Sequence, residues 1–150
     1  LLVLLAVVYP SRHLEEPFDG ILYAALVSLG FATMENFYYL DQFGVAVVTT
    51  RSMITIPAHA FMSVPMGYFV AKSRLQLDKS KVKKNKYYSP MIIVLQGWLI
   101  SAFLHGFYDF LLSMKMEREA YIQIIFMGLV SFFLGRSALK MSKIKLKNLV

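Results

Sequence analysis

The sequence contains no cysteine among its 150 residues, which excludes disulfide bonds and thiolate chemistry within them. Acidic residues are also scarce: nine Asp and Glu stand against sixteen Lys and Arg, giving a formal net charge of +7. Such an excess is typical of proteins that bind nucleic acid. Here, however, the basic residues gather in two short tracts beside apolar segments. We therefore predict contact with a lipid bilayer and its anionic lipids, and no nucleic-acid partner.

Apolar residues dominate what is present. They make up 57% of the chain and the mean hydropathy is +0.55, whereas ordinary soluble domains are about 45–50% apolar. A membrane-spanning helix needs about 20 largely apolar residues. Four segments meet this requirement: 19–40, 52–71, 90–113 and 120–139.

Residues 1–9, LLVLLAVVY, resemble the end of a fifth membrane helix that starts before Leu1. The sequence thus predicts an all-α fold, a polytopic membrane helical bundle with four full transmembrane helices plus the end of a fifth. We expect residues 1–150 to form a single transmembrane domain that is incomplete at its N-terminal end.

Lysine and arginine indicate the orientation, because cytoplasmic loops of membrane proteins carry an excess of both. The basic loop 72–86 and the tail after Gly135 are therefore predicted to be cytoplasmic. The loops at 41–51 and 114–119 then face outward, and the loop at 10–18 faces inward.

Glu35, His59 and His105 are ionisable side chains well inside the predicted spans, and Asp109 lies one helical turn further out than His105. A charged group inside a bilayer costs a few kcal/mol or more and marks a functional site by default. At a rise of about 1.5 Å per residue, Glu35, His59 and His105 all fall roughly 8–12 Å inside the outer boundary, although their spans run in alternating directions. A shared site requires a common depth. We therefore predict that the three meet in one wet pocket, reached by a polar funnel from the outer face.

Two further polar residues accompany them. Asp109 lies four residues after His105 on the same helix face, so it can bind one imidazole nitrogen and fix the tautomer. Asn36 follows Glu35 and offers an amide. Two histidines and a carboxylate match a catalytic zinc site with one open position. The same groups can also activate water without a metal while a His or Asn stabilises the oxyanion, so the residues leave both chemistries open.

Simpler explanations apply to single residues. A lone polar side chain in a span can hold helices together by hydrogen bonding, but the combination at one depth favours a site. His13 lies in the predicted cytoplasmic loop and is expected to be solvated. Arg51, at the outer end of its span, is either an interfacial anchor or a partner for Asp109, Asp41 or a substrate carbonyl.

Three runs of residues and one arginine carry a family resemblance: EPFDGILYAALVSLGFATMEN, then Arg51 and PAHAFMSVPMGYF, then HGFYDF. They resemble the PrsW family of bacterial intramembrane proteases, which is similar in turn to the CAAX prenyl-protein endopeptidases and their bacterial relatives. The resemblance runs from about Glu16 to Phe110. It implies a helical membrane fold with a cavity open to one side, located in the bacterial cytoplasmic membrane. It also implies a membrane-anchored protein substrate, for example an anti-sigma factor, cut on its extracytoplasmic side.

The motifs of that family carry over onto specific positions. F-x-x-x-E-N falls on residues 31–36, the middle histidine falls on His59, and H-x-x-x-D falls on His105 and Asp109. The paired glutamates of the family, E-E-x-x-K, would lie just before Leu1.

Glu15 and Glu16 do not replace these paired glutamates, because they belong to the predicted cytoplasmic loop at the other end of the bundle. If the pair supplies the main general base, these 150 residues lack it and are expected to be inactive alone.

The sequence therefore predicts an enzyme, an intramembrane peptidase that cleaves a membrane-anchored protein near the extracytoplasmic face. Glu35, His59 and His105 would activate water or hold a zinc ion. Asp109 would orient His105, and Asn36 or a histidine would stabilise the oxyanion. One alternative is a non-catalytic membrane scaffold, or a ligand- or metal-binding protein, with a protease-like fold. A proton-coupled transporter is disfavoured, because it predicts ionisable groups at both membrane faces and here they gather toward one.

Overall fold

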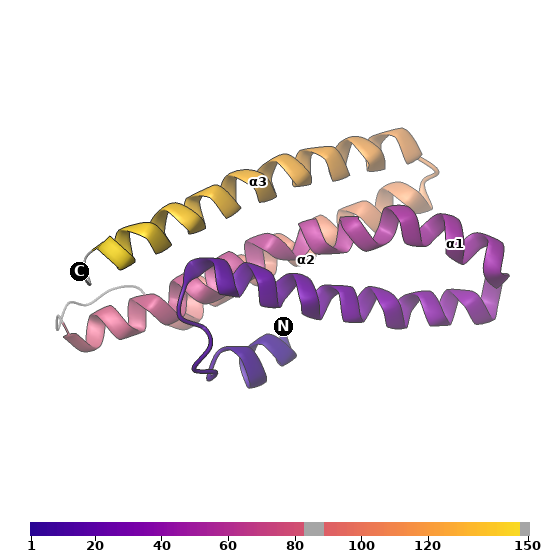
Figure 1. Cartoon of the computed structure of the whole chain (residues 1–150). Coiled ribbons are helices and arrows are strands. Elements are labelled where there is room, and N and C mark those ends of the chain that lie inside the picture. The colour runs from indigo at the N-terminus through magenta and orange to yellow at the C-terminus, as the bar shows by residue number, and fades with distance from the viewer. Residues whose placement is uncertain (83–88, 148–150) are drawn as a thin grey trace.

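The computed structural model describes residues 1–82 and 89–147. A short π-helix, η1 (Leu4–Val8), is followed by three long α-helices: α1 (Pro17–Val82), α2 (Pro90–Ser113) and α3 (Glu117–Lys147). No strand occurs within these described ranges. Figure 1 shows α1 folded back on itself, with α2 and α3 alongside its two halves and η1 beside the first half.

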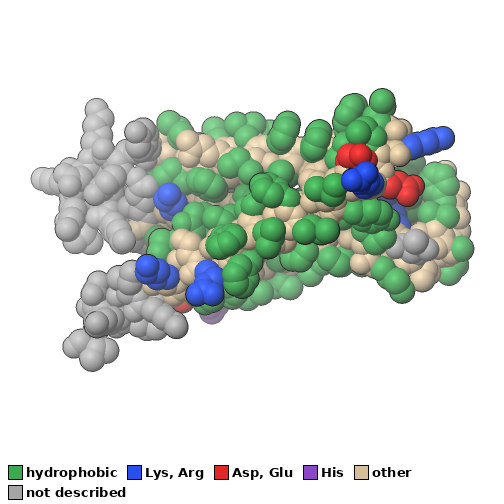
Figure 2. Space-filling view, turned by 90° about the horizontal axis from the view of Figure 1, so that it is seen from above, with side chains coloured by type: hydrophobic (Ala, Val, Ile, Leu, Met, Phe, Trp, Pro, Cys, Tyr) green, Lys and Arg blue, Asp and Glu red, His purple; other side chains and the backbone are tan. Residues whose placement is uncertain are grey.

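In the part of the chain that the structure describes, four helical segments are long and apolar enough to cross a membrane: Pro17–Thr49, Arg51–Leu75, Pro90–Ser113 and Glu117–Ser142. This confirms the predicted all-α bundle with four transmembrane helices. Hydrophobic side chains cover the middle of the face seen in Figure 2, and charged side chains gather toward its two ends. That distribution matches a protein whose middle lies in hydrocarbon.

The prediction of a loop at 41–51 is wrong, because the residues on both sides of Gly44 within this range are helical. The chain reverses at Gly44 alone, with φ 78° and ψ 176°. This backbone conformation is open almost only to glycine, since any Cβ would be strained there. A single residue therefore replaces the expected loop and makes α1 a helical hairpin.

The basic segment 72–86 also differs from the predicted loop. It is helical as far as Val82, and residues 83–88 lie outside the described part. Lysine is a good helix former, so α1 continues past the end of its apolar stretch. The last span also extends beyond the predicted 120–139.

Glycines bring the two halves of α1 into close contact. A Cβ on Gly67 would overlap the carbonyl oxygen of Gly20 and the Cβ of Ala24, and a Cβ on Gly20 would overlap Gly67 and Ala71. Gly20 and Ala24 on one half, and Gly67 and Ala71 on the other, are spaced as small-xxx-small pairs. Such pairs let membrane helices approach closely, because lipid and helix side chains are equally apolar and close packing drives the association.

Pro65 interrupts the backbone hydrogen bonds of α1 without ending the helix. Proline has no N–H, so the carbonyl oxygen of Phe61, four residues earlier, loses its usual partner. The hydroxyl of Ser131 on α3 donates to that oxygen at 3.1 Å. A neighbouring helix thus satisfies the freed group, as hydrocarbon surroundings require.

Candidate functional site

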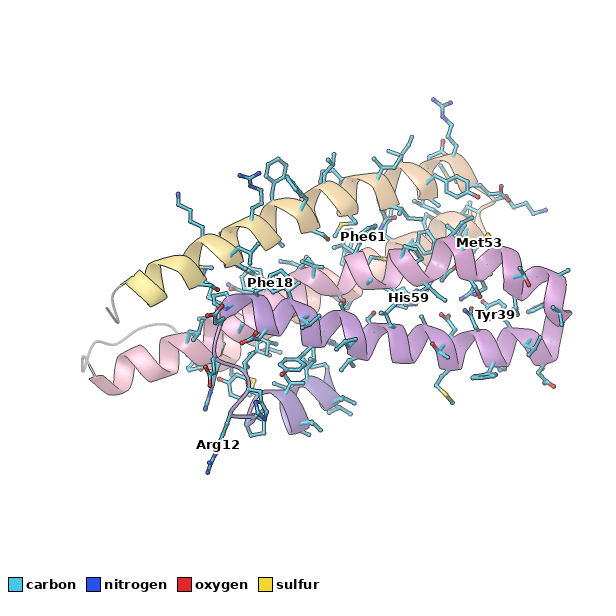
Figure 3. All side chains as sticks on the ribbon, in the orientation of Figure 1. Arg12, Phe18, Tyr39, Met53, His59 and Phe61 are labelled. Carbon is cyan, nitrogen blue, oxygen red and sulfur yellow. The ribbon has the colours of Figure 1, made fainter. Side chains whose placement is uncertain are left out.

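The candidate site lies between the two halves of the α1 hairpin and α2. Glu35 and Asn36 come from the first half of α1, His59 comes from the second half, and His105 and Asp109 come from α2. Figure 3 shows His59 between the two halves of the hairpin. Because the halves run antiparallel from Gly44, residues on either side of the reversal face each other.

The structure brings Glu35, His59 and His105 together. Oε2 of Glu35 lies 3.3 Å from Nε2 of His59. The rings of His59 and His105 have centroids 4.7 Å apart and are inclined at 67°. The carboxylate and the two imidazoles thus form one cluster, as their common depth along the spans predicts.

Two backbone contacts fix the position of His59, which is 4% exposed. Its Nδ1 lies 2.8 Å from the carbonyl oxygen of Thr55, and the carbonyl oxygen of His59 accepts a hydrogen bond from the hydroxyl of Ser28 at 2.9 Å. A carbonyl oxygen only accepts, so Nδ1 carries the proton and donates it. Nε2 is then the nitrogen turned toward Glu35.

This arrangement has an electrostatic consequence. In a neutral His59 with its proton on Nδ1, Nε2 presents a lone pair to the Glu35 carboxylate, which also only accepts. Two acceptors 3.3 Å apart repel each other unless a proton or a cation lies between them. The pair is therefore satisfied by a proton shared between the two atoms, by a bound cation, or by a water molecule that donates to both.

Three buried atoms in the cluster have no hydrogen-bond partner: Oε2 of Glu35, which has an ion pair with Arg51, and Nε2 of both His59 and His105. Buried polar atoms are nearly always satisfied, so such a group of atoms indicates a bound water or ion. Two imidazoles and a carboxylate are also the donor set of a catalytic zinc ion. As they lie, however, no three His, Asp or Glu side chains in the described ranges form a ready metal cluster. The donor chemistry fits zinc, and the side chains would have to close on the ion.

Asp109 lies beside His105 but outside this cluster. Its Oδ2 is 3.6 Å from Nε2 of His105, and the two side chains are 58% and 32% exposed, respectively. That separation suits an ion pair and is too long for a hydrogen bond. The structure therefore brings the predicted pair together without the predicted orienting bond. The role of Asp109 stays a prediction.

Asn36 makes contacts away from the cluster. Its Nδ2 donates to the hydroxyl of Ser52 at 2.9 Å, and its Oδ1 accepts from Nε of Arg51 at 3.3 Å. The side chain is buried and ties the two halves of α1 together near the reversal. An oxyanion role would require the amide to leave Ser52, so this assignment also stays a prediction.

Arg51 is the polar residue whose partner the sequence did not identify. Its Nη2 lies 2.9 Å from Oε2 of Glu35, and its guanidinium carbon lies 3.6 Å above the ring centre of Tyr39. The carboxylate that it contacts is thus Glu35, in place of the predicted alternatives Asp41 and Asp109. Arg51 lies seven residues after the reversal at Gly44 and therefore faces position 37, seven residues before it. This spacing would have indicated that the partner of Arg51 lies among residues 35–39.

A cavity of about 920 Å³ adjoins the cluster. His59 and His105 line it together with residues from the N-terminal segment, both halves of α1, and α2. Most of its lining is apolar, and the ring of Phe31 packs against both histidines, with centroid distances of 5.9 and 6.2 Å. The predicted polar funnel is thus not what this cavity shows: it is a largely apolar space whose lining includes two imidazoles.

Comparison with known proteins identifies relatives of this chain. Residues 1–135 match the family model described as PrsW family intramembrane metalloprotease. Protease PrsW of Bacillus subtilis (strain 168) is 36% identical over 138 residues, which cover 92% of this chain and 59% of the relative. Protease PrsW of Geobacillus kaustophilus (strain HTA426) is 41% identical over 136 residues, covering 91% of this chain and 54% of the relative.

A more distant relative, Protease PrsW of Clostridioides difficile (strain 630), is 30% identical over 129 residues, or 83% of this chain and 51% of the relative. The chain therefore spans between half and three-fifths of the length of these curated relatives. No solved structure matches it significantly.

Proposed function

The chain belongs to the PrsW family of intramembrane metalloproteases, and from this premise we propose that the whole protein hydrolyses a peptide bond of a membrane-anchored protein. One observation carries the proposal. The Glu35 carboxylate and the imidazoles of His59 and His105 meet inside a bundle of span-length helices, and the two imidazoles line an apolar cavity.

Peptide hydrolysis needs a water to be deprotonated, an oxyanion to be stabilised and the leaving amine to be protonated. Glu35 is the anionic group of the cluster and takes the proton of the attacking water or serves as a ligand. The Thr55 carbonyl holds His59 so that Nε2 faces the site. His105 is placed to return a proton to the leaving amine, oriented by Asp109 once their 3.6 Å contact shortens.

In the alternative that uses a metal, Glu35, His59 and His105 would hold a zinc ion instead of acting as base and acid themselves. Its contribution when bound is Lewis-acid polarisation of the scissile carbonyl. Two observations support this assignment: each of the three residues has a buried atom without a hydrogen-bond partner, and His59 and Glu35 turn two acceptors toward each other. Asn36, the neighbour of Glu35 in the chain, would bind the developing oxyanion once its amide leaves Ser52.

The chemistry of the cavity supports an apolar, membrane-borne substrate. Its walls include Met34, Met62 and Trp98, which favour an apolar segment over a charged one. An anti-sigma factor cut near the extracytoplasmic face is the substrate that the motifs suggest. In that orientation, the basic residues of 72–86 and those after Gly135 face the cytoplasm of a bacterial cell.

Single substitutions test the proposal in the complete gene product. Glu35→Gln, His59→Ala and His105→Ala should each lower cleavage of a co-expressed membrane-anchored substrate by a factor of about 100 or more, the scale of general acid–base catalysis. His13→Ala, outside the site, is the matched control and should cleave like the wild type. Retention of cleavage by all three site variants would remove the proposal.

Elemental analysis of the purified protein separates the metal from the metal-free form of the proposal. We expect about one zinc ion per chain, lost on chelation together with cleavage and restored by added zinc. Bound zinc without cleavage of any membrane-anchored substrate would favour a metal-binding protein with a protease-like fold.

A further inference from the structure

Arg51 is a charged residue that contacts the cluster although no catalytic role was predicted for it from the sequence. We propose that Arg51 is a positioning residue, which holds the Glu35 carboxylate beside His59. The proposal rests on the function proposed above and adds to it a residue that controls the geometry of the acid. Arg51 acts through Glu35 and does not touch the substrate.

Three contacts hold the guanidinium group in place. Nη2 lies 2.9 Å from Oε2 of Glu35, Nε donates to Oδ1 of Asn36 at 3.3 Å, and the group stacks over the ring of Tyr39 at 3.6 Å. All three partners lie on the first half of α1, whereas Arg51 lies on the second. A planar guanidinium suits this combination of an ion pair, a directed hydrogen bond and a stacked face.

The same carboxylate oxygen contacts both Arg51 and His59. Oε2 of Glu35 lies 2.9 Å from Nη2 of Arg51 and 3.3 Å from Nε2 of His59. The position of Arg51 therefore sets the position of the oxygen that faces the imidazole. A glutamate side chain has three rotatable bonds, and the Glu35 side chain is 23% exposed, so it has room to turn away once its cation is removed.

Arg51 also lies apart from the space that would receive a substrate. Among the described residues, His59 and His105 line the 920 Å³ cavity, whereas Glu35 and Arg51 do not; Arg51 reaches the two imidazoles only through Glu35. A change at Arg51 should therefore affect the chemical step and leave substrate binding nearly intact. This separation distinguishes positioning of Glu35 from a general loss of structure or of substrate affinity.

The test measures kcat and KM of the complete purified protein, reconstituted with a membrane-anchored substrate. Arg51→Met should lower kcat by about 10- to 100-fold, the scale of a displaced catalytic group, while KM changes by less than about threefold. Arg51→Lys should fall between Arg51→Met and the wild type, because an ammonium can reach Glu35 but cannot also bind Asn36 and stack on Tyr39. Arg118→Met, an exposed arginine at the start of α3, is the matched control.

Two further measurements keep the test independent of folding. Millimolar guanidinium added to Arg51→Ala should restore part of kcat, which a purely structural residue would not allow. Tyr39→Leu should lower kcat without changing KM, whereas Tyr39→Phe, which keeps the ring, should match the wild type. The Tyr39 pair decides the question if the Arg51 variants fail to fold.

The outcomes separate this proposal from the one on which it rests. Wild-type kcat in Arg51→Met, with Glu35→Gln inactive, would overturn the role of Arg51 and leave the protease proposal standing. A raised KM with unchanged kcat would likewise overturn it and would place Arg51 in substrate binding. Cleavage by Glu35→Gln, His59→Ala and His105→Ala alike would remove both proposals together.

Discussion

The close contact between Gly20 and Gly67 predicts opposite effects for the same substitution at two places. A methyl group on Gly67 would overlap the carbonyl oxygen of Gly20 and the Cβ of Ala24. The obstacle is mainly backbone, which cannot swing aside, so the two halves of α1 must separate. A methyl group on Gly135, on α3, would meet no atom of the described residues within 4 Å, so this glycine serves as the matched control.

The magnitudes follow from two terms. Overfilling a packed contact costs typically about 1–3 kcal/mol, and the rigid backbone at this contact places the cost near about 3 kcal/mol. Replacing glycine by alanine inside a helix contributes about 1 kcal/mol in the other direction. Gly67→Ala should therefore lower the free energy of unfolding by about 2 kcal/mol, and Gly135→Ala should raise it by about 1 kcal/mol.

The assay is unfolding by SDS in mixed detergent micelles, followed by circular dichroism, for both variants and the wild type. Adding Gly20→Ala to Gly67→Ala should cost less than Gly20→Ala alone, because the first substitution has already separated the helices. A Gly67→Ala protein as stable as Gly135→Ala would show that the halves of α1 do not meet at this contact.

Two further predictions concern the backbone of α1. Gly44→Ala should lower the free energy of unfolding by about 1–3 kcal/mol, because its φ of 78° strains any Cβ; an unchanged SDS midpoint would contradict the single-residue reversal. Ser131→Ala should cost about 1 kcal/mol in the same titration, because the Phe61 carbonyl oxygen loses its donor. The loss should shrink in a Pro65→Ala background, where a restored N–H can bind that oxygen, and equal losses in both backgrounds would argue against this explanation.

Hydropathy predicted a span well where polar or helix-breaking residues mark its two ends. The span 90–113 was found to the residue, since it begins at Pro90 and a turn follows Ser113. The helical flanks of Gly44 were missed, because their mixed composition is typical of a loop. The helix beyond residue 71 was missed for another reason: hydropathy reports burial in lipid, whereas a lysine-rich stretch can remain helical outside it.

The depth of polar residues along their spans predicted which side chains meet. Glu35, His59 and His105 share a depth, and the structure places them in one cluster. Their immediate partners were not predictable in the same way. The contacts of Arg51 with Glu35, and of Thr55 with His59, depend on helix rotation and side-chain rotamers. The depth of a residue along its span determines neither the rotation of the helix nor the rotamer of the side chain.

The α1 hairpin is fastened at both ends, by the one-residue reversal at Gly44 and by the glycine crossing at Gly20 and Gly67. A hairpin held at two points keeps a fixed distance between its two halves in the stretch where Glu35 and His59 face each other. Substrate segments of different size must then be accommodated by the parts of the cavity wall that α1 does not supply, namely α2 and residues 1–3. Relatives that accept bulkier substrate segments should accordingly differ at positions such as Trp98 and keep the hairpin unchanged.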